Sequence, residues 1–230
     1  MTSQMTSQYK SPKTYLVPRN HVMNLIKNDI DNYVSGMTQV DLHARRSVNK
    51  QDYINKSLID FNTEEDTINA CFKRCLYVLN EVNNRLYLLS PSFNNIEWHI
   101  SFFNGINYED GLAHTRFNII FLPVKILSIS DEQLVRLLVH EKIHIIQKSI
   151  PFDPFIVNYM KQYTVVGHKY YVNTLIRANP DSDDFVYKNG NGEMMMFVYK
   201  DKTPTSINDV IKLSQYEHPY EQMAYYYSNL

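Results

Sequence analysis

The sequence is poor in the features that would place it in several common classes of protein. Only two cysteines occur, Cys71 and Cys75, and their spacing of four residues in a helical pattern indicates neighbouring reduced thiols, not a disulfide framework. No apolar run approaches the roughly 20 residues that cross a bilayer, and the polar start MTSQMTSQYK lacks a hydrophobic signal region. The formal net charge of -1 provides no electrostatic attraction to nucleic acid or to an anionic membrane. We therefore expect a soluble intracellular protein with neither of these partners.

The chain does contain enough apolar residues for one sizeable core, since 44% of its 230 residues are hydrophobic and 20% are charged. The first 20 residues hold little that can be buried, so we predict a flexible tail over residues 1–20, with Tyr15, Leu16 and Val17 as the residues that could dock. Residues 21–60 are expected to form a helical segment packed on the main domain, which spans residues 61–230.

The spacing of apolar residues indicates both helices and strands, and hence the α+β class. Helical periodicity predicts helices over residues 20–37, 62–82, 130–148, 155–163 and 217–227. Alternation and turn residues predict strands over residues 96–102 and 115–122, and a hairpin whose arms are residues 185–187 and 194–199. Ser130 and Gln133 form a potential capping box at the start of the third helix.

That third helix carries the stretch HEKIH. Because four residues span slightly more than one helical turn, His140 and His144 project from the same face and can offer two nitrogens to one zinc ion. Glu141 lies about 100° round the helix, where it can act on water without being a ligand. Gln133 and Gln147 share a narrow polar stripe with the histidines, while apolar residues cover most of the remaining surface. The alternative is a core helix that contains two histidines by chance.

From Ile96 to Leu230, the order of two strands, the HEKIH helix and a later helix resembles the zincin metallopeptidases. The resemblance implies a small mixed or antiparallel sheet packed on the HExxH helix, additional helices at both ends of the chain, and a sheet edge that receives the substrate. The metzincin branch would need glycine at position 147 and histidine at position 150, where this chain has Gln147 and Ile150. That branch is excluded, and a gluzincin-like arrangement is favoured.

A gluzincin-like site needs a glutamate as third zinc ligand on a later helix. The chain has no glutamate between Glu141 and Glu193, and its E221-Q222-M223-A224 stretch is similar to the E-x-x-A pattern of the gluzincin ligand helix. The resemblance therefore implies that Glu221 completes the zinc site with His140 and His144. Three other residues compete for this role: Glu217, His218 and His168, of which the last would give a three-histidine site of the SprT-like sort.

Other residues near the motif have two interpretations each. Tyr225 follows Glu221 by one helical turn, so its hydroxyl could stabilise an oxyanion, or its ring could simply pack. His114 and Arg116 begin a strand that could be the substrate-facing edge, or they could be structural. Lys142 points nearly opposite the histidines, so we expect its long stem to reach solvent. The acidic stretch DSDD at residues 181–184 lacks the glycine and glutamate of a calcium loop, so we predict a solvated turn.

We expect a zinc-dependent endopeptidase that acts on a protein or peptide substrate, with Glu141 as general base. The chain is similar to compact metallopeptidases of prokaryotes and large DNA viruses, which is compatible with a viral or host-cell cytoplasmic location. One alternative is a catalytically inactive zincin-fold protein that binds zinc and serves a structural or interaction role. Another is a nucleic-acid-linked peptidase of the SprT-like sort, which zinc binding by His168 would favour.

Overall fold

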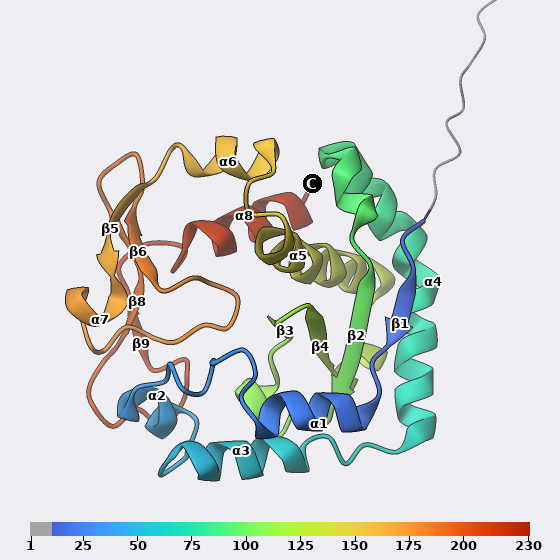
Figure 1. The fold of residues 1–230 in the computed structure, drawn as a ribbon, viewed down its shortest axis with the longest axis horizontal. Helices are drawn as coiled ribbons and strands as arrows, with labels where there is room; N and C mark the ends of the chain where they lie inside the picture. Colours follow the sequence, from blue (N-terminus) through green and yellow to red (C-terminus); the bar gives the residue numbers. More distant parts are fainter. Residues whose placement is uncertain (1–10) are drawn as a thin grey trace, which may run out of the picture.

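The computed structural model describes residues 11–230, which form an α+β fold (Figure 1). The helices are α1 (Arg19–Lys27), α2 (Gln39–Ala44), α3 (Lys50–Ile59), α4 (Glu65–Leu89), α5 (Asp131–Ser149), α6 (Pro154–Met160), α7 (Lys169–Val172) and α8 (Pro219–Ser228). The strands are β1 (Thr14–Leu16), β2 (Trp98–Phe103), β3 (His114–Arg116), β4 (Ile119–Pro123), β5 (Thr164–His168), β6 (Phe185–Lys188), β7 (Met194–Met195), β8 (Phe197–Tyr199) and β9 (Val210–Lys212). Short 3-10 helices span Pro91–Asn95, Tyr108–Gly111 and Val124–Ser128. No helix within residues 11–230 is both long enough and apolar enough to cross a bilayer.

The central sheet is mixed and has the strand order β1-β2-β4-β3. β1, β2 and β4 run parallel to one another, and β3 runs antiparallel to β4 at one edge. β2 confirms the first predicted strand. The single strand predicted over residues 115–122 is wrong, because the chain turns back at Phe117, whose φ of 55° is left-handed, and forms β3 and β4 instead.

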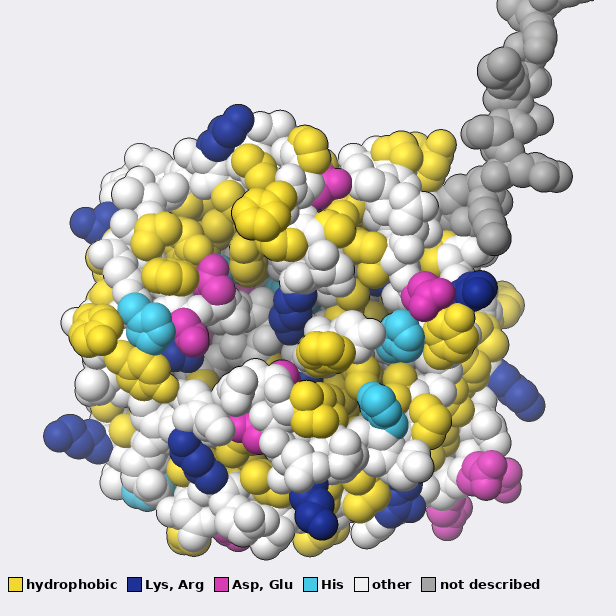
Figure 2. Space-filling model, in the orientation of Figure 1, with side chains coloured by type: hydrophobic (Ala, Val, Ile, Leu, Met, Phe, Trp, Pro, Cys, Tyr) yellow, Lys and Arg dark blue, Asp and Glu magenta, His cyan; other side chains and the backbone are white. Residues whose placement is uncertain are grey.

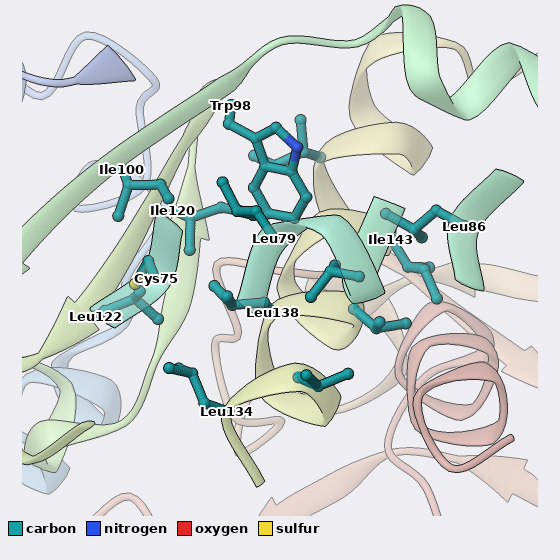
Figure 3. Close-up of a cluster of buried hydrophobic side chains, with 14 of the residues drawn as sticks. Cys75, Leu79, Leu86, Trp98, Ile100, Ile120, Leu122, Leu134, Leu138 and Ile143 are labelled. Carbon is teal, nitrogen blue, oxygen red and sulfur yellow. The ribbon is translucent and has the colours of Figure 1, made fainter. Parts of the chain in front are cut away.

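One face of this sheet packs against α4 and α5. Alternate residues of β2 and β4, including Trp98, Ile100, Ile120 and Leu122, point to this side and meet Leu138 of α5 (Figure 3). α8 covers a further side of α5 through buried apolar residues. The helix with the HEKIH stretch is therefore surrounded by apolar contacts over most of its circumference, as its sequence predicted.

The other face of the sheet is covered by the N-terminal helices. Phe103 and Phe121 point to this side and pack with Phe61, whose ring meets that of Phe121 edge to face at a centroid distance of 5.9 Å. Val22 of α1 and Tyr53 of α3 belong to the same cluster. The helical segment before residue 61 thus forms one layer of the fold, with the sheet between it and α5.

The start of α5 confirms the predicted capping box, but the environment of Lys142 does not match the prediction. The Ser130 hydroxyl accepts from the Gln133 N–H at 3.2 Å, and the Gln133 side chain accepts from the Ser130 N–H at 2.9 Å. Lys142 is 1% exposed, and its Nζ donates to the carbonyls of Ile96 and Glu97 at 2.8 and 2.6 Å. The chain just before β2 offers these two acceptors, so the ammonium joins α5 to the sheet instead of reaching solvent.

The other predicted elements are confirmed with changed limits. Residues 1–10 of the predicted flexible tail lie outside the described residues. Thr14–Leu16 forms β1 beside β2 and α1 begins at Arg19, so these residues belong to the folded structure and not to a flexible tail. α1 ends at Lys27, because left-handed residues at positions 29 and 32 interrupt the predicted helix. α4 is longer than predicted, and α6 and α8 lie where they were expected. β6 and β7 form the predicted hairpin, but residues 197–199 leave it and pair with β9.

Candidate metal centre

α8 packs along α5 and brings Glu221 to the two histidines of the HEKIH stretch. The Nε2 atoms of His140 and His144 lie 3.1 Å apart. Oε2 of Glu221 lies 3.5 Å from the His140 nitrogen and 3.7 Å from the His144 nitrogen. Ala224, one turn after Glu221, is buried in the core that joins the two helices, where its small side chain permits their close approach. The structure thus places together the three residues that the sequence predicted as ligands.

The spacing of these three atoms fits one zinc ion. Ligands about 2.0–2.1 Å from a tetrahedral zinc lie about 3.3–3.4 Å from one another. This value falls between 3.1 and 3.7 Å, the shortest and longest sides of the triangle formed by the two histidine Nε2 atoms and Oε2 of Glu221. Two imidazole nitrogens and one carboxylate oxygen are also a donor set that zinc accepts in catalytic sites. Three protein ligands leave a fourth tetrahedral position for water or substrate.

The His144 ring is held in a form that suits metal binding. Its Nδ1 lies 2.9 Å from Oε1 of Gln147, an oxygen that can only accept, so Nδ1 carries a proton and, in the neutral ring that binds a metal, Nε2 presents a lone pair to the site. The Gln147 amide donates in turn to the carbonyl of Tyr220 on α8 at 3.2 Å. The polar stripe predicted on α5 therefore includes a residue that orients one ligand and connects the two ligand helices.

Glu221 is oriented by a residue that the sequence analysis missed. Asn179 donates from Nδ2 to Oε1 of Glu221 at 2.7 Å, which leaves Oε2 directed at the histidines. Burial opposes ionisation of Glu221, but His144 and His140 favour the carboxylate and hold its pKa well below the usual range. Asn179 lies in an irregular segment before Pro180, where no periodicity marks it, so only the three-dimensional structure identifies it.

Glu141 lies beside the triangle and takes no part in it. Its side chain is buried, and Oε2 has no hydrogen-bond partner among the described residues. Burial raises the pKa of Glu141 well above its usual range, and the negative charges of Asp181 and Glu221 add to the effect, while His140 opposes it. A buried carboxylate with a free oxygen and a raised pKa is suited to accept a proton from a water molecule in the cleft.

A cleft of about 510 Å³ opens over these residues. Glu141, His140 and Glu221 line it on one side, and Leu112 and Ala113, which directly precede β3, line it on another. Tyr225 also lines the cleft and is 51% exposed. The structure therefore places the predicted oxyanion-stabilising tyrosine on the cleft wall, next to solvent.

The three competing ligands are engaged elsewhere. Glu217 forms an ion pair with Arg177 and lies before the first residue of α8. His218 caps α8 by accepting from the Tyr220 N–H at 3.1 Å, and its Nε2 contacts Asp183. The third competitor, at position 168, caps α7 and also lies outside the ligand triangle.

The acidic stretch at residues 181–184 is not the solvated turn that the sequence predicted. Asp181 is only 7% exposed, and its Oδ1 accepts from the N–H of Thr115 at 2.8 Å. Arg116, a candidate for the substrate-facing edge, is fully buried and pairs with Asp29 and Asp31. His114 is buried too and stacks on Phe121. β3 is the edge strand that was predicted. Arg116 does not line the cleft, whereas His114 does, and its Nε2 has no hydrogen-bond partner among the described residues.

A second cavity lies close to the cleft. Figure 2 shows it as a hollow left of centre, between α7 and the turn after β3, on a face where acidic and basic side chains are interspersed. Its volume is about 760 Å³. Ala178, Asn179 and Pro180 line both spaces, and the next residue, Asp181, lines the cleft alone, so we call residues 178–181 the dividing segment. This segment separates the hollow from the cleft over the metal centre.

Comparison with protein families, with curated proteins and with solved structures finds no match to this chain. What the site can do is therefore argued from its own residues.

Proposed function

We propose that the chain is a zinc-dependent peptidase with a gluzincin-like arrangement of the zincin fold. His140, His144 and Glu221 would hold the ion, which is the observation that carries the proposal: two imidazoles and one carboxylate converge at distances that suit a tetrahedral site. When bound, zinc would polarise a water molecule and a peptide carbonyl. A mixed sheet whose edge strand lies beside the cleft supports the same proposal.

The residues around the ion would carry the proton transfers. Glu141 accepts a proton from the water as the water oxygen attacks the carbonyl carbon. Glu141 then passes this proton to the nitrogen of the departing amine. The unpartnered Oε2 of Glu141 leaves room for this hydrogen bond. Tyr225 donates its hydroxyl proton in a hydrogen bond to the oxyanion. Asn179 and Gln147 keep Glu221 and His144 in position throughout.

Metal content tests the proposal first. The purified full-length protein, dialysed against a zinc buffer, should hold close to one zinc per chain, as measured by mass spectrometry of the metal. Glu221→Gln should weaken zinc binding by more than about 100-fold, because loss of a direct ligand exceeds the typical 10–100-fold effect of losing a residue that supports one. Competition with a chelating dye measures this affinity.

Glu217→Gln provides the matched variant, since the same change is made four residues earlier, before α8 begins, in a residue that pairs with Arg177. It should retain tight zinc binding. Protein that takes up no zinc would refute the proposal, and equal losses in the two variants would remove Glu221 as the specific ligand. A protein that binds zinc but cleaves no peptide would instead be the inactive zinc-binding alternative.

A further inference from the structure

The outer edge of β3, which faces away from β4, cannot pair with a further strand at Thr115, because the backbone groups of this residue already have partners. Thr115 donates from its backbone N–H to Asp181 at 2.8 Å, and its carbonyl accepts from Lys148 Nζ at 3.0 Å. Both groups therefore point away from β4, toward the side on which an added strand would pair. The Thr115 hydroxyl also bonds to Asp181 and accepts from Lys148. A peptide that lies along β3 cannot pair with Thr115 while these two side chains are in place.

An extended peptide still has one backbone position to pair with. Ala113 lies two residues before Thr115, so its N–H and C=O point to the same outer side. It lines the cleft together with His140 and Glu141. Beyond Thr115 the strand soon ends, because Phe117 has a left-handed φ of 55°. The accessible edge is therefore short: it starts in the cleft and stops at Asp181.

The group that faces the cleft at this closed end is anionic. Lys148 directs its three N–H donors at the carbonyl and hydroxyl of Thr115 and at the carbonyl of Pro180, and its Nζ lies 3.5 Å from Oδ1 of Asp181, with which it forms an ion pair. The hydrogen bonds that Asp181 accepts from described residues and its ion pair with Lys148 all end on Oδ1, so Oδ2 has no partner among the described residues. Asp181 is more than nine-tenths buried and lines the cleft. A buried carboxylate with one free oxygen attracts a cation that can donate a hydrogen bond.

We propose that Asp181 binds the free α-amino group of a peptide, so that the chain acts on amino-terminal residues. This inference rests on the proposed peptidase function and narrows it. A peptide antiparallel to β3 that pairs with Ala113 has its amino end directed toward Thr115. Its ammonium group then meets Asp181, whereas a peptide of opposite direction would bring a carboxylate to the same acid and be repelled. The charge of Asp181 and the antiparallel direction thus both predict that the amino end of the peptide lies at Asp181.

The reaction that follows releases one or two residues from the amino end. Water adds its oxygen to the carbonyl carbon, the C–N bond breaks, and the departing amine of the shortened peptide takes the proton that Glu141 accepted. A long chain cannot extend past Asp181 unless the dividing segment moves. The endopeptidase expected from the sequence is therefore replaced by an enzyme that requires a free amino terminus.

Binding of matched peptides tests this inference separately from catalysis. Zinc-loaded Glu141→Gln protein is titrated into two pentapeptides of alanine and leucine, each labelled with a fluorophore at the C-terminal end. One has a free α-amino group. The other is N-acetylated and carries one added lysine beside the label, so that the two probes have the same net charge. Fluorescence anisotropy should show that the peptide with the free amine binds at least about tenfold more tightly than the acetylated one. This is the size of effect expected for a hydrogen bond to a charged group.

Two variants locate the effect. Asp181→Asn should abolish the difference between the two probes, because the neutral amide no longer attracts the ammonium. Asp184→Asn is the matched control, since this acid lies in the same stretch but is 56% exposed in its side chain and pairs with Lys169. It should leave the difference unchanged. If Asp181→Asn does not fold, the comparison of the two probes on Glu141→Gln still decides the question.

The outcomes distinguish the two proposals. Equal binding of the two probes, or wild-type cleavage of the acetylated peptide as fast as the free one, would overturn the amino-terminal site and leave the peptidase. Tighter binding of the free amine without any cleavage by the wild type would support the amino-terminal site and refute the peptidase. Cleavage of the free peptide alone, one or two residues from its start, supports both.

Discussion

Glu109 and Glu141 are two buried glutamates that line the same cleft, at 3% and 2% exposure, yet their surroundings are opposite. Arg45 donates from Nε and Nη2 to the two oxygens of Glu109 at 2.9 and 2.8 Å, and the hydroxyl of Tyr53 donates to the same carboxylate at 2.5 Å. Glu141 has acids nearby and, within residues 11–230, no hydrogen bond at Oε2. Similar burial therefore accompanies complete pairing in one case and its absence in the other.

The two pKa shifts follow from this difference. Burial opposes ionisation of Glu109, but the charge and hydrogen bonds of Arg45 lower its pKa to about 2, with a smaller contribution from Tyr53. Burial raises the pKa of Glu141, and no bound donor reverses the effect. The presence or absence of hydrogen-bond donors, and not burial, therefore decides whether the pKa is lowered or raised. We infer that Glu109 serves stability and that Glu141 is reserved for a group that enters the cleft.

The same substitution at the two positions should therefore have different consequences. Glu141→Gln is expected to lower peptide turnover by about 10²–10⁴-fold, the usual contribution of a general base, while zinc content stays near one per chain. Its free energy of unfolding should change by less than about 1 kcal/mol, because the altered oxygen has no partner to lose. Steady-state kinetics and urea denaturation measure the two quantities. Turnover equal to that of the wild type would exclude Glu141 as the base.

Glu109→Gln should show the reverse pattern. It leaves the buried Arg45 guanidinium without its charge partner, which costs about 3–5 kcal/mol of unfolding free energy. Urea denaturation at neutral pH measures the loss, with Glu141→Gln as the matched comparison. A loss below about 1 kcal/mol would show that the ion pair does not serve stability.

The acid dependence of stability gives a further check on Glu109. Because its folded pKa of about 2 lies below the ordinary value of 4.5, its contribution is complete above about pH 4.5 and is lost as the pH falls toward 2. The Gln variant cannot titrate at this position, so the fall in stability between these pH values should be smaller than in the wild type.

The sequence could predict the parts of this structure that depend on local spacing. His140, Glu141 and His144 share a helix, so their relative positions follow from 3.6 residues per turn. The capping box of α5 and the turn between β6 and β7 are equally local. Glu221 was identified by its resemblance to a ligand helix, and the structure places it in the predicted triangle.

Other parts depend on contacts between distant residues, and spacing does not encode them. Arg45 and Glu109 are 64 positions apart, and neither belongs to a pattern that would pair them. Lys142 and Asp181 were expected in solvent because their types favour it, but each is buried with acceptors or donors supplied by another segment. Asn179 belongs to the same class of unpredicted contact.

Asn179 allows the smallest of the expected effects to be tested. Its Nδ2 donates to both Glu217 and Glu221 at 2.7 Å, while its Oδ1 accepts from the N–H of Asp181. Asn179→Ala should weaken zinc binding by about 10–100-fold, because Glu221 loses the bond that directs Oε2 at the histidines. A competition assay with a chelating dye measures the affinity.

Asn173→Ala is the matched control for this change. The Asn173 side chain accepts from the N–H two residues later, at Leu175, as Asn179 does from Asp181, but it makes no bond to a glutamate in the part of the chain that the structure describes. Both variants therefore lose the local turn, whereas only Asn179→Ala also loses the hydrogen bond to Glu221. An equal change in zinc affinity would attribute the effect to the turn, whereas weakening in Asn179→Ala alone would show that a neutral amide outside the triangle sets the geometry of the site.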